Sequence, residues 1–458
     1  VQTCALPISG GTSSSDNYSF YGINSGVMVK GGATVNITGG TVTTDAAGAN
    51  GVFSYGANNG TTNATGDGTT VNISGTTITT TGDGSGGIMT TYGGTTNASN
   101  LTITTSGGSS APIRTDRGGG WVNVSGGTYT SNGQGSPAIY STAAVIVSDA
   151  TLISNKSEGT VIEGTGSISL TNCNLKATNS AMNGNANFLD TVMIYQSMSG
   201  DSSTGTSEFT MTGGSITSNS GHVFHVTNTT STINLSGVSI TNNDVGGILM
   251  SVCDDGWSGG TNAATVNATG QTLSGGVLVG SNSTLALNLK GSSSFTGYVS
   301  GNITNAKSAS VSTSVGTVNV VVESGSAWTL TADSAITSIS GEGTINYNGY
   351  TLNVNGTEYK DETIDEIEET SKPAIKKITL KNIKGAAKVK VTVKASGSPT
   401  KYIVKYKYAG GKWKTKTVTK STFKLNAKAG KKLTVKVRAV NSAGKSAWKK
   451  KTIKVDKK

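Results

Sequence analysis

The stretch VNITGGTVT at residues 35–43 is the first of eight units that align without internal gaps. The others are VNISGTTIT at 71, TNASNLTIT at 96, VNVSGGTYT at 122, VIVSDATLI at 145, ISLTNCNLK at 168, FTMTGGSIT at 209 and INLSGVSIT at 233. Between 71 and 168 the units start 25, 26, 23 and 23 residues apart. This period predicts a solenoid, because a propeller blade needs about 40 residues or more.

Each unit has apolar or small residues at its first, third and eighth positions, as in Val35, Ile37 and Val42. The first two alternate as in a strand, and Gly or Asn at the fifth position allows a bend. A further apolar residue follows 15 to 17 positions after most unit starts: Val52, Ile88, Ile113, Ile139, Ile162, Phe224 and Ile248. Three inward-facing segments per coil are therefore predicted, and stacked coils would bury a continuous core.

The charges divide the chain sharply. Residues 1–371 hold 8 Lys or Arg and 24 Asp or Glu, a net charge of −16, whereas residues 372–458 hold 28 and one, a net charge of +27. We expect a β-helix over 10–356, an acidic linker over 357–371 and a Lys-rich module over 372–458. The first nine residues, VQTCALPIS, share no period with the rest and are interpreted as an adapter-derived artefact, with a true N-terminal portion missing.

In the Lys-rich module, six or seven short stretches alternate apolar residues with Lys, which predicts a β-sandwich with Tyr402 and Trp413 as core aromatics. The three cysteines, Cys4, Cys173 and Cys253, lie too far apart for a disulfide framework or a paired metal motif. Because no run of about 18 apolar residues occurs, no membrane span is expected.

Two resemblances follow from these residues. The repeat resembles the right-handed β-helix of the pectate-lyase-like superfamily and of bacterial adhesin-like surface proteins. The segment VKVRAVNSAGKSAW at 435–448 resembles the F strand, FG loop and G strand of fibronectin type III domains. The expected fold class is all-β, a right-handed parallel β-helix (β-solenoid) followed by a small fibronectin type III-like β-sandwich. These resemblances imply an extracellular or bacterial cell-surface location.

A candidate binding face comes from strand alternation. The residue after each inward residue of the third segment should point outward. These neighbours are Phe53, Met89, Arg114, Tyr140, Glu163, His225 and Leu249, and nearby loops add Tyr55, Tyr92, Asp116, Arg117, Asp254, Asp255 and Trp257. Aromatic platforms beside hydrogen-bonding groups favour saccharide binding. The alternative is a solvent face with scattered large residues, and the segment 180–205 is either a groove wall or a loop packed on itself.

No catalytic residue is assigned. Asp254-Asp255 and Gly221-His222 resemble pairs in polygalacturonases, but their order is reversed and the Arg-Ile-Lys motif of that family is absent. His222 and His225 are three residues apart and are not expected to share a strand face, so neither a metal nor another cofactor is predicted.

A ladder of outward Thr and Ser pairs, from Thr41/Thr43 to Ser239/Thr241, resembles ice-binding solenoids. Thr151/Ile153 and Asn174/Lys176 interrupt this ladder.

The hypothesis is a non-catalytic, adhesin-like surface or secreted protein whose β-helix binds a polysaccharide or a host or matrix glycan. The basic module would tether it to an anionic cell-wall or matrix polymer. Specific nucleic-acid binding is disfavoured because stacking aromatics are not interleaved with the charges in the sequence. The alternatives are a polysaccharide lyase or glycoside hydrolase of the pectate-lyase-like superfamily, and a purely structural stalk.

Overall fold

The computed structural model describes residues 20–57, 65–360, 372–441 and 444–456, and, apart from the two helical residues 20 and 21, every secondary-structure element within them is a strand. Strands β1–β36 belong to one compact unit and strands β37–β44 to a second. Residues 1–9, interpreted above as an artefact, and Cys4 with them, lie outside the described residues. Among the described residues, no helix has the length and apolar character needed to cross a lipid bilayer.

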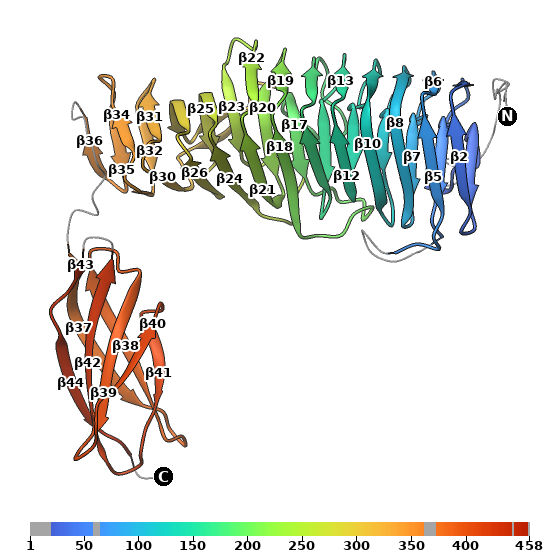
Figure 1. The fold of residues 1–458 in the computed structure, drawn as a ribbon. Coiled ribbons are helices and arrows are strands. Elements are labelled where there is room, and N and C mark those ends of the chain that lie inside the picture. Colours follow the sequence, from blue (N-terminus) through green and yellow to red (C-terminus); the bar gives the residue numbers. More distant parts are fainter. Residues whose placement is uncertain (1–19, 58–64, 361–371, 442–443, 457–458) are drawn as a thin grey trace. The chain divides into compact units, whose positions relative to one another are not determined.

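The first unit is a parallel β-helix whose coils stack side by side in register (Figure 1). One coil consists of β2 (Thr34–Thr38), β3 (Thr41–Thr44) and β4 (Val52–Tyr55). The next consists of β5 (Thr70–Ser74), β6 (Thr77–Thr80) and β7 (Ile88–Thr91), each paired in parallel with its predecessor. The three predicted segments per coil are therefore confirmed, since the aligned apolar residues are also register partners.

Two large parallel sheets run along this unit. One, here called the third-strand sheet, consists of β1 (Val27–Lys30), β4, β7, β9 (Ile113–Thr115), β11 (Ile139–Ser141), β14 (Thr160–Glu163), β17 (Asp190–Tyr195), β20 (His222–Thr227), β23 (Ile248–Val252), β25 (Thr272–Val279), β27 (Ser294–Ser300), β31 (Ala327–Leu330) and β34 (Thr344–Asn346).

The other large sheet combines the first and second strands of the coils. It consists of β2, β3, β5, β6, β8 (Gly94–Thr105), β10 (Gly120–Ser131), β12 (Ala144–Ser148), β13 (Thr151–Ser154), β15 (Ser167–Thr171), β16 (Asn174–Ala177), β18 (Thr206–Thr212), β19 (Ser215–Ser218), β21 (Thr229–Ser236), β22 (Ser239–Asn242), β24 (Asn262–Thr269), β26 (Ser283–Lys290), β30 (Thr317–Val322) and β33 (Ser338–Ser340). Strands β28 (Asn302–Thr304) and β29 (Ser310–Thr313) form a separate antiparallel pair.

The interior of the β-helix is mostly apolar, with a row of buried Thr and Ser at the ends of the second strands. Val71, Ile78 and Ile88, which come from three sides of one coil, are each 0% exposed. Aromatic side chains also fill the interior, where the rings of Phe209 and Phe224 meet edge to face at 5.9 Å. Stacking coils therefore buries a continuous column of side chains, which no single coil could bury alone.

The register differs from the sequence alignment at two coils. Ile139 pairs with Thr160 rather than with Ile162, and Phe224 pairs with Met250 rather than with Ile248. Both differences are two residues, so the side chains stay on the predicted side of the sheet, because only an odd shift reverses the faces. The third strand of one coil was also missed, since β17, which follows the unit at 168, stands in the segment 180–205.

The C-terminal end of the β-helix extends beyond the predicted boundary at residue 356. Strand β36 (Thr357–Tyr359) pairs antiparallel with β35 (Leu352–Val354), which itself pairs with β32 (Ser334–Ile336). The first residues of the predicted linker are therefore part of the β-helix unit, where the hairpin covers a strand edge that would otherwise be open. Residues 361–371 lie outside the described part of the chain.

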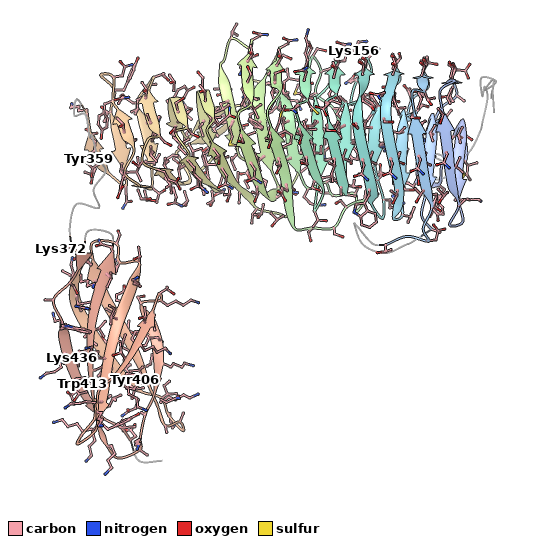
Figure 2. All side chains as sticks on the ribbon, viewed as in Figure 1. Lys156, Tyr359, Lys372, Tyr406, Trp413 and Lys436 are labelled. Carbon is pink, nitrogen blue, oxygen red and sulfur yellow. The ribbon has the colours of Figure 1, made fainter. Side chains whose placement is uncertain are left out.

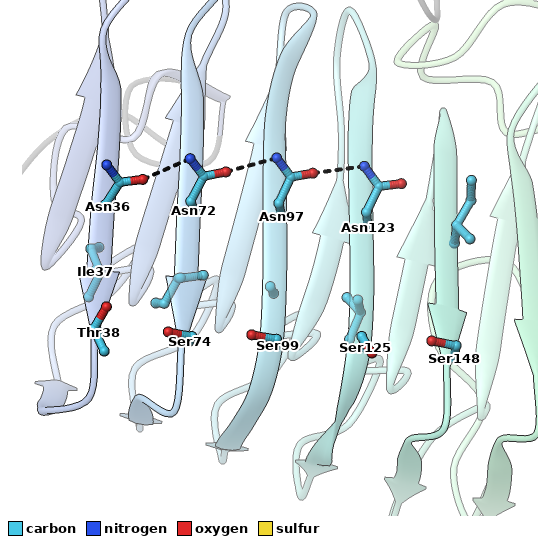
Figure 3. Close-up of a pocket in the computed structure, with 14 residues that line it drawn as sticks. Asn36, Ile37, Thr38, Asn72, Ser74, Asn97, Ser99, Asn123, Ser125 and Ser148 are labelled. Atoms are coloured by element: carbon cyan, nitrogen blue, oxygen red, sulfur yellow. Dashed lines mark hydrogen bonds between the residues drawn. The ribbon is translucent and has the colours of Figure 1, made fainter.

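The outer face of the first strands carries an asparagine ladder (Figure 3). The side-chain amides of Asn36, Asn72, Asn97 and Asn123 are joined by hydrogen bonds of 2.8, 2.9 and 2.9 Å. The ladder is interrupted at Ile146, whose side chain is 51% exposed, and resumes from Asn234 to Asn267 and Asn288. The predicted Thr ladder is in register on the second strands, where Thr41 aligns with Thr77 and Thr102.

The second unit is an antiparallel β-sandwich, as predicted. One sheet contains β37 (Ala374–Asn382), β38 (Lys388–Ser396) and β41 (Thr422–Asn426). The other contains β39 (Lys401–Tyr408), β40 (Lys414–Val418), β42 (Lys432–Asn441), β43 (Gly444–Lys445) and β44 (Lys449–Lys454). Both sheets contribute to one core, to which Tyr402 belongs as expected. Trp413, in contrast, is 38% exposed and is not a core residue, because it lies in the turn between β39 and β40.

Candidate functional site

The candidate site lies on the outer side of the third-strand sheet. Parallel pairing places Arg114, Tyr140, Val161, Met193 and His225 next to one another on successive coils, all pointing away from the coil interior. Alternation along each strand explains this direction, since the neighbouring residues fill the core. Glu163 belongs to a second outward row, where it pairs with Tyr195.

The predicted column is not a solvent-exposed face. Phe53 and His225 are 0% exposed and Glu163 is 1% exposed. At the N-terminal end, Gly22 runs so close to the Phe53 ring that a Cβ on it would lie 2.5 Å from Cγ. Further along, the connections 178–189 and 253–261 supply side chains that contact the column. The outward direction was predicted correctly, but the additional layer of loops was not.

A cavity of about 310 Å³ lies between the sheet and these loops, within the predicted groove region. It is lined by Gly135, Pro137, Tyr140, Glu158, Val161, Asn183, Gly184, Asn185, Met193, Tyr195, Ser197, Met198, Ser199 and Trp257. Tyr195 and Trp257 form one aromatic corner, with ring centroids 4.8 Å apart in an edge-on arrangement. The cavity therefore combines aromatic surface with hydroxyl, amide and carboxyl groups, as small-molecule and saccharide sites do.

Glu163 is the centre of a hydrogen-bond network behind this cavity. Its carboxylate accepts hydrogen bonds from the hydroxyls of Tyr140 and Ser197, and from the Tyr195 hydroxyl at 3.1 Å. Burial raises the pKa of Glu163, and the three donors oppose that rise. Burial also raises the pKa of Tyr140 and Tyr195 well above the ordinary range, so both hydroxyls remain donors. The network fixes two of the aromatic rings that line the cavity.

Arg114 and Asp116 form an ion pair beside this network, at 2.5 Å between Nη2 and Oδ2. The Arg114 guanidinium also lies 5.5 Å from the centre of the Tyr140 ring. The Asp116 side chain is only 3% exposed and that of Arg114 15%. Burial therefore raises the pKa of Asp116, and the charge of Arg114 opposes that rise. This pair is therefore packing and charge compensation beside the cavity, and neither residue lines the cavity itself.

Asp255 joins three segments that enclose the site. Its side chain, 0% exposed, accepts hydrogen bonds from the Asn187 backbone at 2.7 Å and from the Asn187 amide at 2.8 Å. Its other oxygen lies 3.2 Å from His225 Nε2. Burial acts to raise the pKa of Asp255, but the His225 hydrogen bond and charge, with the backbone donors, lower it overall. The neighbouring Asp254 is exposed and accepts a hydrogen bond from Asn262 at 2.5 Å.

The two histidines are closer together than predicted. The Nδ1 atoms of His222 and His225 both lie 2.7 Å from Ser251 Oγ, so the expectation that they point in different directions is wrong. Burial, with the proximity of His225, lowers the pKa of His222 to about 3 and keeps its ring neutral. Ser251, His225 and Asp255 have the partner order of a nucleophilic triad, but all three side chains are buried and out of reach of a substrate.

Two buried acids were missed by the sequence analysis. Glu158 is 5% exposed and lines the cavity, and Asp190, 1% exposed, starts β17 on the neighbouring coil. Burial raises the pKa of both, and for Asp190 the charge of Glu158 adds to this effect. Asp190 Oδ1 has no hydrogen-bond partner among the described residues. The alternating stretch DTVMIY at 190–195 was the available signal for this strand, although its distance from the unit at 168 concealed it.

The structure therefore separates the predicted site residues into groups. Tyr140 and Trp257 line the cavity, Glu163 fixes Tyr140, and Arg114 with Asp116 packs beside them. His225 and Asp255 form a buried link behind the site, Asp254 lies in solvent, and Phe53 packs under a different segment. Among the described residues, no group of three His, Cys, Asp or Glu side chains is arranged to hold a metal ion.

No family model matches the chain, and no curated protein matches it in sequence. Among solved structures, the fibronectin type III domain of human collagen alpha-1(XX) is similar at 21% identity and a TM-score of 0.18, over 19% of this chain and 90% of that domain. The twitchin kinase region from C. elegans is similar at 20% identity and a TM-score of 0.14, over 18% of this chain and 16% of that one.

Chitinase ChiW from Paenibacillus sp., described as a cell-surface-expressed multi-modular enzyme, is similar at 12% identity and a TM-score of 0.17. That match covers 90% of this chain and 24% of the chitinase chain. Scores this low place the chain in no family and transfer no activity to it.

Proposed function

We propose that this chain is a non-catalytic, adhesin-like protein of the bacterial surface or extracellular space that binds a polysaccharide or matrix glycan in the cavity of its β-helix. The basic module then tethers it to an anionic wall or matrix polymer. The β-helix belongs, in this proposal, to the pectate-lyase-like group of right-handed helices, used here as a rigid scaffold for binding.

The observation that carries this proposal is the cavity lined by Tyr140, Tyr195 and Trp257. Aromatic rings offer flat apolar surface to the C–H face of a sugar, and the amides of Asn183 and Asn185 at the rim offer polar contacts to its hydroxyls. The rings of Tyr140 and Tyr195 are held by Glu163 before any ligand arrives. A preorganised site loses less conformational entropy on binding, which favours recognition of a weakly binding saccharide.

The state of the carboxylates favours binding over catalysis. Glu163 already accepts hydrogen bonds from three hydroxyls, and Asp116 and Asp255 are committed to Arg114 and to the loop contacts. Such groups position neighbouring side chains, and they are poorly available to take a proton from a substrate.

A glycan array probed with the full chain tests the proposal. We expect a defined set of glycans to bind, and Trp257→Ala to weaken that binding by about tenfold, equivalent to about 1.4 kcal/mol. Tyr359→Ala is the matched control, since Tyr359 is an aromatic residue of the same unit, 39% exposed and outside the cavity. Binding that is equal in both variants would remove the cavity from the proposal. Binding to no glycan at all would favour the structural stalk.

One observation supports a second function, a polysaccharide lyase or glycoside hydrolase. Glu158 lines the cavity and burial raises its pKa, which is the property of a carboxylic acid that donates a proton to a leaving group. Incubation of the full chain with pectins and other polysaccharides would then release reducing ends or unsaturated uronides, and Glu158→Gln would abolish the release. Product formation of this kind would replace the non-catalytic proposal.

A further inference from the structure

The outer face of the β39–β40–β42–β44 sheet gathers cations from adjacent strands. Lys405 on β39 is paired with Lys436 on β42, which is in turn paired with Lys450 on β44. Their sequence neighbours Val404 and Val437, which also pair with each other, are 0% exposed and face the sandwich core. Alternation therefore sends the Lys side chains to the opposite, solvent-facing side of the sheet.

Two tryptophans lie on the same face, among these cations. The Trp413 ring has Lys436 Nζ at 4.8 Å and Lys407 Nζ at 5.1 Å from its centre; Figure 2 labels Trp413 and Lys436. The Trp448 ring has the Arg438 guanidinium at 4.7 Å and Lys405 Nζ at 5.6 Å. Aromatic rings are therefore interleaved with cations on this face, and the sequence already places Trp413 between Lys412 and Lys414.

The charges on this face are not neutralised within the module. Asp456 is the one acidic residue of 372–458, and it accepts a hydrogen bond from Asn382 at 2.7 Å. Like charges that stand opposite each other on neighbouring strands destabilise a sheet. A polyanion that lies across the face would relieve this repulsion, so its binding gains free energy from the arrangement of the cations.

We propose that the surface formed by Trp413, Trp448, Lys405, Lys407, Lys436 and Arg438 binds an acidic polysaccharide, a sugar chain that bears carboxylate, sulfate or phosphate groups. The inference rests on the tethering role proposed above and assigns it a surface and a ligand class. Ammonium and guanidinium groups pair with the anionic groups, and the exposed part of Trp413 packs against the sugar rings.

Two features favour an acidic polysaccharide over a nucleic acid. Of the 28 cations in the module, 27 are Lys, whose compact charge lacks the planar fork with which Arg recognises base edges. Single-stranded nucleic acids are bound where successive bases stack on free aromatic faces. The rings of Trp413 and Trp448 already have Lys and Arg groups of their own sheet over them.

Binding of the full chain to immobilised polygalacturonate and to wall teichoic acid tests the surface, with dextran as a neutral polymer and polyuridylate as a nucleic acid. We expect Trp413→Ala combined with Lys436→Gln to weaken binding to the acidic polysaccharides by about tenfold or more. The matched control is Lys390→Gln with Lys424→Gln, which removes two paired, exposed Lys from the opposite sheet. Its effect should stay near twofold, as for a general loss of charge.

Each outcome is decisive. Preference for polygalacturonate or for teichoic acid identifies carboxylate or phosphate as the recognised group. Equal losses in the two double variants would overturn the assigned surface while leaving a tether based on net charge. Tighter binding to polyuridylate than to either polysaccharide would overturn the ligand class. No binding to any polyanion would overturn the tethering role itself, and a glycan still bound by the β-helix cavity would show that the first half of the proposed function stands independently.

Discussion

In the β-helix the ionisable side chains of the candidate site are buried beside partners, whereas in the sandwich they are solvent-accessible beside like charges. Asp255 and Glu163 illustrate the first arrangement, with every contact made to the chain itself. Lys405 and Lys436 illustrate the second, since each pairs across the sheet with another Lys. The first arrangement provides a rigid site of fixed shape, and the second provides long-range attraction that salt weakens.

The largest effect is expected at Asp255. Asp255→Ala should lower the free energy of unfolding by about 3–5 kcal/mol, because it leaves the buried His225 ring and the part-buried Asn187 and Gly256 amides without their acceptor. Asp254→Ala, at the exposed neighbour, should cost less than about 1 kcal/mol. Urea unfolding of the full chain, followed by tryptophan fluorescence, measures both. Equal losses for the two variants would remove the distinction between a buried and a solvated acid.

The next largest effect is a difference in the salt dependence of binding between the two units. Raising NaCl from about 50 mM to about 500 mM should weaken binding of the sandwich to an acidic polysaccharide by about 100-fold, because the exposed charges are screened. Glycan binding in the β-helix cavity should change by less than about twofold over that range, since its charged groups are compensated internally. Surface plasmon resonance at several salt concentrations provides the measurement. A salt-independent affinity of the sandwich would contradict the electrostatic account.

Asp190 should give the β-helix a distinctive pH dependence. Burial raises the pKa of Asp190 in the folded state above its value in the unfolded chain. At pH values below the unfolded pKa, which is near 4, the protonated carboxyl therefore contributes fully to the stability of the fold. This contribution falls by about 1.4 kcal/mol per pH unit as the pH rises from there toward the folded pKa. Asp190→Asn should remove that loss and raise the melting temperature at pH 7 while leaving it nearly unchanged at pH 3. No gain at pH 7 would show that the folded carboxyl ionises without cost.

The smallest effects are expected at two kinds of surface row, the hydrogen-bonded Asn ladder of the β-helix and the like-charged Lys pairs of the sandwich. Asn97→Ala should cost about 1 kcal/mol, because Asn97 donates to Asn72 and accepts from Asn123 in the ladder. Lys424→Gln should leave stability unchanged or raise it by a few tenths of a kcal/mol, roughly the value of relieving a like-charge pair with Lys390. Thermal unfolding at low salt tests both substitutions. A destabilising Lys424→Gln would mean that the Lys rows contribute favourable contacts.

The sequence predicted the coils because their core positions repeat. Val35 and Val71, or Val42 and Ile78, occupy equivalent sites, so one alignment identifies every regular strand. It failed at β17, whose coil carries the two long connections 178–189 and 196–205, and at Ile162, where the true register partner of Ile139 is Thr160. Periodicity is informative only where consecutive coils have nearly equal lengths.

The candidate site was predicted only in part, for a related reason. Alternation correctly directed Tyr140 and His225 out of the core. Burial of His225 and Phe53 depends on segments with no repeat of their own, such as the one around Gly22 and the connection that bears Asp255. In the sandwich, the position of Trp413 was misjudged because a turn residue was treated as part of a strand. The sequence repeat predicts contacts between regular strands, and it carries no information on contacts made by irregular segments.

Binding of an array-selected glycan to the full chain at about 0.5 M NaCl tests the preorganised site most directly, because exposed charges are screened there and the cavity remains. We predict that the wild-type chain and Tyr359→Ala retain binding, and that Trp257→Ala, shown to be folded by circular dichroism, loses about tenfold in affinity. Loss of all glycan binding at this salt concentration, or equal affinity of Trp257→Ala and the wild-type chain, would contradict a preorganised binding site in the β-helix.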